Sequence, residues 1–278
     1  MQGASRESLA SLRETLGEQT GSAGAAALAA LSQELFGVVS LLAAQGALRR
    51  TLSDPGLEPD NKVRVVDTLF GERLAAPALE LLRQTARLRW SAPRDIVDAL
   101  EAMAVEAALQ QAEVEGNLDE VEDELFRFER IIDGQPELRA AVTDRNLPAE
   151  VKTELLHRLL DGRVADVSYA LVERAVLAPR GRTVERVLDE FTELAAKRRE
   201  RLIARVTTAT ALTPEQQDSL AAALGREFNR DVRLQLVVDP DLIGGVTVRI
   251  GDEVIDGSVL RHLGAAHRRL TGGSGLRT

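Results

Sequence analysis

The chain has 278 residues, a formal net charge of -9, 44% hydrophobic and 28% charged residues, and no cysteine. This length suits two or three globular domains, and the composition is that of a folded, soluble protein rather than a disordered one. The composition excludes disulfides, thiolate nucleophiles and cysteine-ligated metals, and the acidic balance argues against a nucleic-acid partner, whose binding site needs a basic stripe.

The aromatic residues and histidines, which could form a binding pocket or a metal site, are few, and the histidines are not spaced as metal ligands. Aromatic residues make up only 3% of the chain, although small-molecule pockets usually have aromatic walls. His262 and His267 are five residues apart and do not share one helical face, and His157 is remote from both. We therefore expect no catalytic residue, no cofactor and no metal, and three histidines at the surface or on helix flanks.

Helical spacing of apolar residues dominates the first 200 residues. Leu9, Leu12 and Leu16 predict a helix over residues 6–16 that ends at Gly17. The Ala-rich run over residues 23–44 is interrupted by polar residues, so we interpret it as a buried helix rather than a membrane span. Further helices are expected over 59–70, 78–90 and from Pro93 to about Glu115, where Gly116 and Asn117 end the last one.

The same order of residues returns after 90 positions. Residues 34–36 (Glu-Leu-Phe) match residues 124–126, and further matches at this offset are Leu48/Leu138, Arg49/Arg139, Asp54/Asp144, Leu57/Leu147, Lys62/Lys152, Leu69/Leu159 and Leu81/Leu171. Leucines alone match by chance in helical sequences, whereas polar residues at one fixed offset rarely do. The pattern predicts a duplicated helical bundle.

Two charged stretches are interpreted as solvated or dipole-stabilising. The acidic run over residues 113–133 could suggest a metal or acid–base cluster, but consecutive carboxylates on a helix point to different sides, so we expect a solvated face. An electrostatic contact with a basic partner is its functional alternative. The basic residues near the end of the helix over 183–202, which are Lys197, Arg198, Arg199 and Arg201, suit the helix dipole there.

The last 75 residues predict a small α/β unit. A β-branched run at 206–209 is followed by a helix that starts with the capping box Thr213 to Gln216. Alternating runs at 232–238 and 246–250 predict strands, the first with Val232, Leu234, Leu236 and Val238 on one buried face. A two-residue turn at Gly251 and Asp252 predicts a hairpin into residues 253–256.

The glycine pair Gly244-Gly245 leaves two interpretations. A phosphate-binding loop needs glycines that lead into a helix N-terminus, where free N–H groups favour an anion. Here they lead into a strand, which favours a bulge or a close backbone approach at the edge of the sheet. Ser258 is placed to cap a final helix.

Taken together, the residues predict a mainly α protein with a small α/β part. Two tandem N-terminal helical bundles, residues 1–104 and 105–205, are followed by a C-terminal α/β domain with a β-hairpin, residues 206–278. The bundles would share the long helix that starts at Pro93.

The C-terminal stretch resembles one family closely. The run VDPDLIGGVTVRIGDEVIDGSVLRHL, preceded by residues 209–213 (Ala-Thr-Ala-Leu-Thr), resembles the C-terminal signature of the delta subunit of F-type ATP synthases, the family of the mitochondrial oligomycin-sensitivity-conferring protein. The residues of this run that we single out as structural are Asp239, Pro240, Gly244, Gly245, Gly251, Asp256, Gly257 and Ser258. Residues 107–200 are similar to the single helical bundle that this family usually has, and residues 5–104 resemble an additional copy in front of it.

The resemblance implies a peripheral-stalk (stator) subunit without catalysis of its own. Its implied partners are the alpha subunits of the catalytic head, with beta as a further candidate, and the stalk's b subunit. Each bundle is expected to hold one alpha-subunit N-terminal helix in a groove. The implied location is the cytoplasmic face of the plasma membrane, with membrane association only through the complex. The alternative is a helical-repeat interaction adaptor unrelated to ATP synthase.

The interpretation of the glycine pair predicts the effect of a mutation. Gly245→Val should destabilise the C-terminal domain by roughly 1–3 kcal/mol, because a β-branched side chain tolerates neither positive φ nor a close backbone approach. The measurement is the thermal unfolding transition of that domain. An unchanged transition would remove the interpretation.

Overall fold

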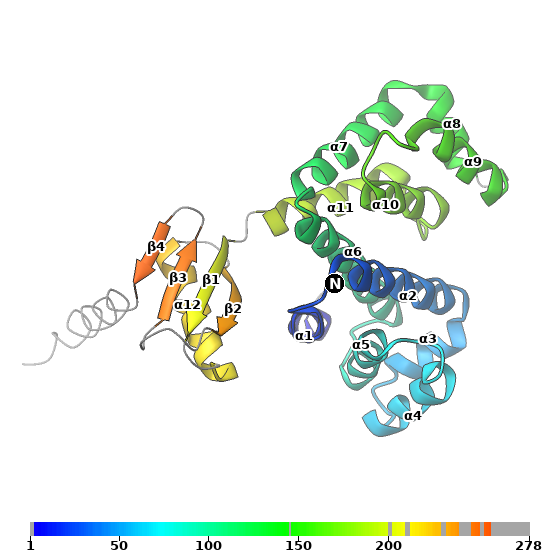
Figure 1. Cartoon of the computed structure of the whole chain (residues 1–278). Coiled ribbons are helices and arrows are strands. Elements are labelled where there is room, and N and C mark those ends of the chain that lie inside the picture. The colour runs from blue at the N-terminus through cyan, green and yellow to red at the C-terminus, as the bar shows by residue number, and fades with distance from the viewer. Residues whose placement is uncertain are drawn as a thin grey trace, which may run out of the picture. The chain divides into compact units, whose positions relative to one another are not determined.

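The computed structural model describes residues 3–144, 146–199, 202–208, 212–228, 232–238, 246–250 and 253–256 (Figure 1). It divides the chain into a helical unit, Met1–Arg198, and a second unit, Arg199–Thr278. The predicted class, mainly α with a small α/β part, is confirmed. Strand β1 begins at Leu202, before the predicted start of the C-terminal domain. The division of the helical part at residue 104 stays a prediction.

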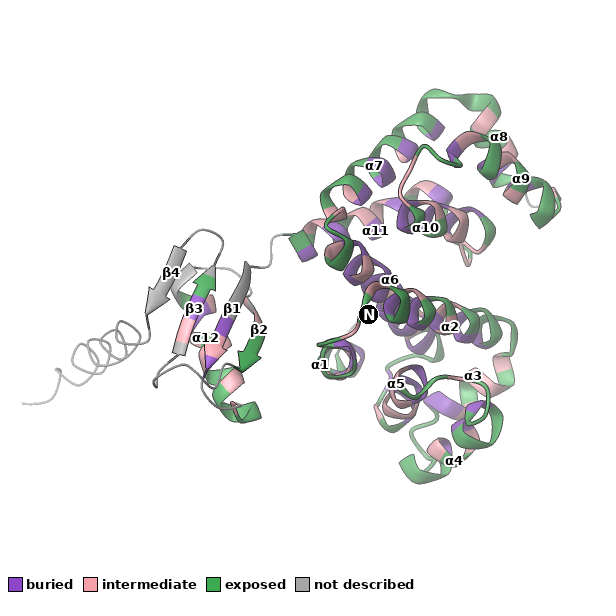
Figure 2. Cartoon of the chain, in the orientation of Figure 1, coloured by how far each residue is buried: buried purple, intermediate pink, exposed green. Residues whose placement is uncertain are grey.

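Within the described residues, the helical unit contains eleven helices. They are α1 Ala4–Thr20, α2 Ala25–Ala44, α3 Gly46–Ser53, α4 Pro59–Phe70, α5 Ala76–Arg87, α6 Pro93–Glu115, α7 Leu118–Gly134, α8 Pro136–Thr143, α9 Ala149–Leu160, α10 Asp166–Leu177 and α11 Val184–Arg199. Figure 2 shows that buried residues line their inward sides while their outer faces are exposed, as expected for amphipathic helices.

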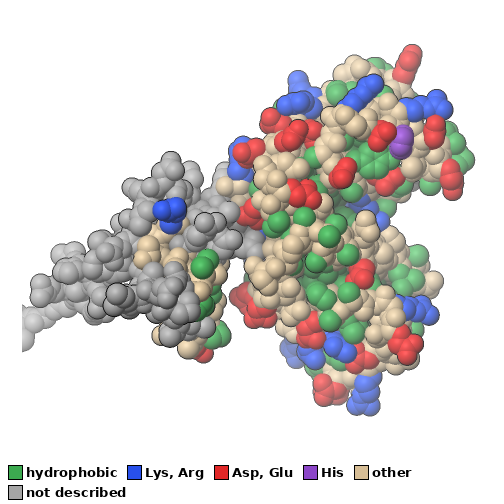
Figure 3. Space-filling model, viewed as in Figure 1, with side chains coloured by type: hydrophobic (Ala, Val, Ile, Leu, Met, Phe, Trp, Pro, Cys, Tyr) green, Lys and Arg blue, Asp and Glu red, His purple; other side chains and the backbone are tan. Residues whose placement is uncertain are grey.

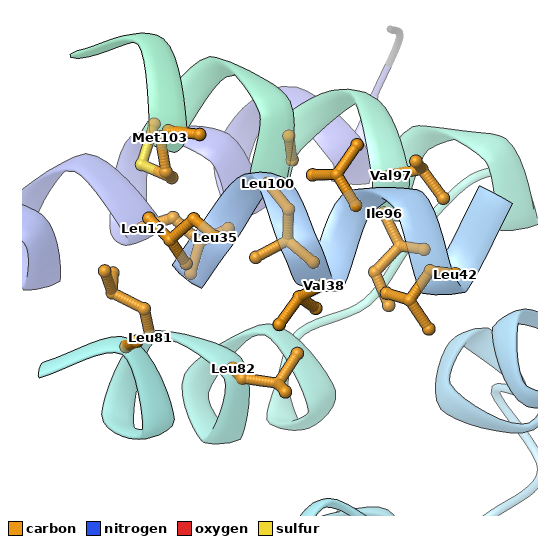
Figure 4. Close-up of a cluster of buried hydrophobic side chains, with 14 of the residues drawn as sticks. Leu12, Leu35, Val38, Leu42, Leu81, Leu82, Ile96, Val97, Leu100 and Met103 are labelled. Atoms are coloured by element: carbon orange, nitrogen blue, oxygen red, sulfur yellow. The ribbon is translucent and has the colours of Figure 1, made fainter. Parts of the chain in front are cut away.

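Two hydrophobic cores organise this unit. The first joins α1 to α5 with the N-terminal part of α6, and Figure 4 shows Leu35, Leu82 and Leu100 pointing toward one another from three of these helices. The second core joins the C-terminal part of α6 with α7 to α11. Each core defines one bundle, which we call the first and the second bundle.

Helix α6 belongs to both bundles. Its residues up to Ala107 contribute to the first core, and Val105, Ala108, Leu109 and Ala112 contribute to the second. The predicted helix from Pro93 to Glu115 is thus confirmed, and it ends at Gly116, whose φ of 79° is left-handed and favours glycine. No loop separates the bundles, because one continuous helix passes from core to core.

The helices of the two bundles repeat at the predicted offset. The bounds of α3, α4 and α5 are each 90 positions before those of α8, α9 and α10. The matching polar residues also have matching partners: the Glu34 carboxylate accepts a hydrogen bond from the amide of Ala75 at 3.1 Å, and Glu124 accepts one from Ala165 at 3.0 Å. These carboxylates satisfy free amides at the starts of α5 and α10.

Two further matching pairs are similar in the two copies, whereas Arg49 and Arg139 differ: Arg49 donates to the carbonyls of Leu42 and Ala43, and Arg139 donates to Asp133 and Glu185. Asp54 and Asp144 each accept a backbone amide two residues later, at 2.8 Å in both copies, which stabilises the same turn. Lys62 and Lys152 are both buried. Lys152 donates to the carbonyl of Val142 at 2.9 Å, and burial lowers the pKa of Lys62 from its ordinary value.

One predicted helix end in the helical unit was wrong, and two interpretations of charged residues hold only in part. Helix α1 continues through Gly17 to Thr20, because the Thr20 hydroxyl donates to Gln110 at 2.9 Å and Gln110 donates back to the Thr20 carbonyl at 3.0 Å. In the acidic run, Glu124 is buried as the cap described above rather than solvated. Arg198 does more than complement a helix dipole, since it is buried and forms an ion pair with Glu113.

The second unit contains β1 Leu202–Thr208, α12 Pro214–Phe228, β2 Val232–Val238, β3 Val246–Ile250 and β4 Glu253–Asp256. The strands form one sheet in the order β2-β1-β3-β4. β1 and β2 are parallel and are connected through α12, whereas β3 is antiparallel to both β1 and β4. Val206, Leu224 and Val248 form its small described core.

Two local predictions for this unit had different outcomes. The capping box is confirmed, because Gln216 accepts from the amide of Thr213 at 2.9 Å and the Thr213 hydroxyl accepts from the amide of Gln216 at 3.3 Å. The buried face predicted for β2 holds only for its first half, since Leu236 and Val238 are exposed. β2 is an edge strand, and the described core does not extend to its end.

The repeated cap predicts unequal effects in the two copies. Glu124→Ala should lower the free energy of unfolding of the full chain by about 1–2 kcal/mol, because it leaves a helix-start amide without its charged acceptor. Glu34→Ala is the matched control and should cost less, since its hydrogen bond lies at the exposed surface. Urea unfolding followed by circular dichroism measures both. Equal losses would contradict this account of burial.

Candidate functional site

The structure describes little of the C-terminal signature. Asp256 lies in β4, where its backbone pairs with Thr247 of β3. The other seven residues singled out there, which are Asp239, Pro240, Gly244, Gly245, Gly251, Gly257 and Ser258, lie outside the described residues. Their predicted structural role therefore stays a prediction. The pairing of β3 with β4 agrees with the predicted hairpin.

Among the residues that the structure describes, a buried cluster of charged side chains lies where the two bundles meet. Glu101 of α6 has a side chain that is only 4% exposed, and it binds two arginines from the loop between α10 and α11. Arg180 contacts both of its carboxylate oxygens and also donates to Asp98 at 2.7 Å. Arg182 donates to Glu101 at 2.6 Å and to Glu190 at 2.5 Å. We call these five residues the Glu101 cluster.

The backbone of the α10–α11 loop is shaped to reach this cluster. Arg180 has a φ of 53° and Gly181 a φ of 81°, and within the described residues Arg180 is the one non-glycine residue with positive φ. A left-handed conformation costs an ordinary residue free energy, so it persists where neighbouring interactions hold it. Here the Arg180 carbonyl accepts from Arg94 at 2.6 Å, and its side chain is held by Glu101 and Asp98.

A second contact between the bundles involves Arg174 of α10. Its guanidinium lies 4.9 Å from the ring centroid of Phe36 in α2, and it donates to the Ser40 hydroxyl at 2.8 Å. Burial lowers the pKa of Arg174, partly offset by the negative charge of Glu101. An arginine stacked on an aromatic ring is attracted by the negative face of the ring. Phe36 itself packs against both hydrophobic cores.

The second bundle also contains an open cavity of about 770 Å³. Apolar side chains from α8, α10 and the start of α11 line it, among them Val142, Val176 and Val184, together with the buried Lys152. Arg139 and Arg182 lie at this cavity and are both paired with carboxylates: Arg139 with Asp133 and with Glu185, which also lines the cavity, and Arg182 with Glu101. The lining contains no histidine or cysteine.

The charged groups of the Glu101 cluster are held in ion pairs with one another. Among the residues that the structure describes, no group of three or more His, Asp or Glu side chains could hold a metal ion. The carboxylates of the Glu101 cluster are neutralised by arginines rather than poised beside a proton donor. In the view of Figure 3, acidic and basic side chains are interspersed over the helical unit.

Helix α2 is the one described helix that is long and apolar enough to cross a membrane by length and composition. In the structure one face of α2 packs against α6 and into the first core, and Leu28, Leu35 and Leu42 are fully buried. The interpretation from sequence as a buried helix thus holds for this face only, because the opposite face, which includes Leu41, is exposed.

Sequence reasoning missed the residues that join the bundles. Glu101 and Arg180 are 79 positions apart, and charged residues on helices and in loops are usually solvated. The turn-forming Gly181 after Arg180 was the one local signal for an unusual backbone at this point.

The Glu101 cluster predicts a large and specific loss of stability. Glu101→Ala should lower the free energy of unfolding by about 3 kcal/mol, because it leaves two largely buried arginines without their shared partner. Glu190→Ala is the control: its carboxylate is 32% exposed, so the loss should stay below about 1 kcal/mol. Urea unfolding of the full chain measures both. A small loss for Glu101→Ala would show that the cluster does not hold the bundles together.

Comparison with known proteins agrees with this architecture. A family model described as the ATP synthase delta (OSCP) subunit matches residues 104–270. The chain is 47% identical to the ATP synthase subunit delta of Acidothermus cellulolyticus, over 97% of this chain and 99% of that protein. It is 46% identical to that of Streptomyces coelicolor, over 97% and 98%, and 43% identical to that of Thermobifida fusca, over 98% and 100%.

The similarity to these relatives extends over residues that the family model does not match. Because the alignments cover almost the whole chain, the relatives share the region before residue 104, which holds most of the first bundle. These relatives therefore also have the region that we predict to be an additional copy of the bundle. The chain belongs to the ATP synthase delta (OSCP) subunit family.

Proposed function

We propose that this chain is a stator subunit that holds the catalytic head of the ATP synthase to the membrane-anchored peripheral stalk. Membership of the family makes it a component of an ATP synthase complex, associated with the membrane through that complex. The partners proposed for it are the N-terminal helices of the alpha subunits, with beta as a further candidate, and the b subunit. Its proposed location is the cytoplasmic face of the plasma membrane.

The observation that supports this proposal is the rigid joint between the two bundles. A stator must resist the torque of the rotor, so it needs partner-binding surfaces on elements that do not bend relative to each other. Helix α6 passes through both cores, and the Glu101 cluster ties the α10–α11 loop back to it. Clamping in this way needs no reacting group, and we propose that the subunit has no catalysis of its own.

The adaptor alternative has less support. A transcription or signalling scaffold unrelated to ATP synthase would not be expected to match the delta family over nearly its full length. A basic groove in the helical part would favour it, whereas acidic and basic side chains are interspersed on the face of the helical unit that Figure 3 shows.

Co-purification tests the proposal directly. The full chain with an affinity tag, isolated from detergent-solubilised membranes of its own organism, should retain the alpha and b subunits together. The variant Glu101→Ala should retain fewer of both, because a loosened joint weakens simultaneous binding. Mass spectrometry identifies the chains. Recovery of the tagged protein from the cytosol without either subunit would contradict the proposal.

A further inference from the structure

The cavity of the second bundle has the size and the apolar lining of a small-molecule site. Its volume of about 770 Å³ lies within the range of about 300–1,000 Å³ that is usual for ligand pockets. It is formed where α8, the start of α9 and the end of α10 meet the α10–α11 loop. An apolar molecule placed there would be removed from water, which favours binding. The apolar side chains of its lining are Val142, Leu147, Ala149, Val176, Leu177, Pro179 and Val184.

Lys152 of α9 brings a buried positive charge to this cavity. It is 8% exposed and lies in the cavity wall. An ammonium has three N–H donors, and the hydrogen bond that the structure describes for this one goes to the carbonyl of Val142 at 2.9 Å. Within the described part of the chain, no Asp or Glu forms an ion pair with Lys152. Because a buried charge is costly without an opposite charge beside it, this ammonium favours an anion in the cavity.

The other charged groups of the described lining are already paired. Arg139 and Glu185 bind each other at 2.7 Å, and Arg182 is held by Glu101. Lys152 is therefore the one cation among these lining residues whose charge is not matched by a carboxylate. One unmatched positive charge suits a singly charged carboxylate better than a doubly charged phosphate, since the second negative charge would have no partner.

The two copies of the bundle differ at the loop that borders the cavity. The position 90 residues before Arg180 is Trp90, which is 8% exposed and belongs to the first core. Arg180 instead pairs with Glu101, and it is absent from the cavity lining although its neighbours Pro179 and Gly181 are part of it. At this point of the repeat the first copy thus buries an indole, whereas the second copy borders an open cavity.

We propose that this cavity binds a small carboxylic acid with an apolar body, of the class of medium-chain fatty acids. The carboxylate accepts a charge-assisted hydrogen bond from the ammonium of Lys152, and the hydrocarbon chain lies against the valine and leucine side chains of the wall. The proposal goes beyond the stator function, because holding two partner subunits together requires no small ligand.

Isothermal titration calorimetry of the full chain with octanoate, below its micelle concentration, tests this proposal. We expect one site per chain. Lys152→Met should weaken octanoate binding by at least about tenfold, because it removes the charge-assisted hydrogen bond and keeps an unbranched side chain in the cavity wall. Octan-1-ol has the same hydrocarbon chain without the charge, so it should bind the native chain and Lys152→Met with equal affinity. Acetate should not bind, since it has almost no apolar body.

The matched control is Lys62→Met, which removes the equivalent buried lysine of the first bundle and should leave octanoate affinity unchanged. A second variant, Thr143→Trp, places an indole at an exposed position of the cavity lining. It should weaken the binding of octanoate and octan-1-ol alike, and it tests the site even where Lys152→Met fails to fold. Circular dichroism melting of each variant verifies folding.

Three results would overturn the proposal. They are a native chain that does not bind octanoate, a folded Lys152→Met variant that binds it as tightly as the native chain, and a Lys62→Met variant that loses as much affinity as Lys152→Met. Unchanged binding to Thr143→Trp would also place the ligand elsewhere and contradict it. None of these results involves a partner subunit, so the stator function would stand in each case.

Discussion

Helix α6 is buried by two hydrophobic cores, and this double burial is the constraint on which the helical unit depends. A helix that serves two cores cannot have the single apolar stripe of a surface helix, and its buried residues include Ile96 and Leu100 on one side and Val105 and Leu109 on the other. Small alanines between them allow close approach of α2. The polar residues left on α6 are then available to pair with the α10–α11 loop, as Glu101 does.

The duplicated bundles show which interactions a repeat preserves and which it can change. The carboxylate caps at Glu34 and Glu124 and the turns at Asp54 and Asp144 act inside each copy, so both copies need them. The positions that face the other copy have changed. Gln84 reaches a serine of its own bundle, whereas its counterpart Arg174 reaches across to α2. The joint between the bundles thus uses positions whose counterparts in the first bundle make contacts within that bundle.

Much of the fold could be predicted because its signals are local. Three such signals each act within a few residues: the capping box at Thr213, the left-handed Gly116 and the spacing of leucines. The offset of 90 residues also indicated the polar residues Glu34 and Glu124, which stabilise helix starts. The joint could not be predicted, since the pairing of Glu101 with Arg180 depends on how distant helices pack. The predicted end of the first helix at Gly17 was wrong for a related reason, since it too depends on a distant contact. A glycine often ends a helix, but the side-chain bonds of Thr20 to Gln110 extend α1 past it.

Because α6 is at once the last helix of one copy and the first of the next, a new copy requires five helices rather than six. Two copies therefore take eleven helices, the number that the described part of the helical unit contains. Gene duplication in steps of this size would lengthen such a protein without inventing a new linker, since each junction inherits a core-spanning helix. Each further copy would add one more core next to the last, as in a solenoid repeat protein.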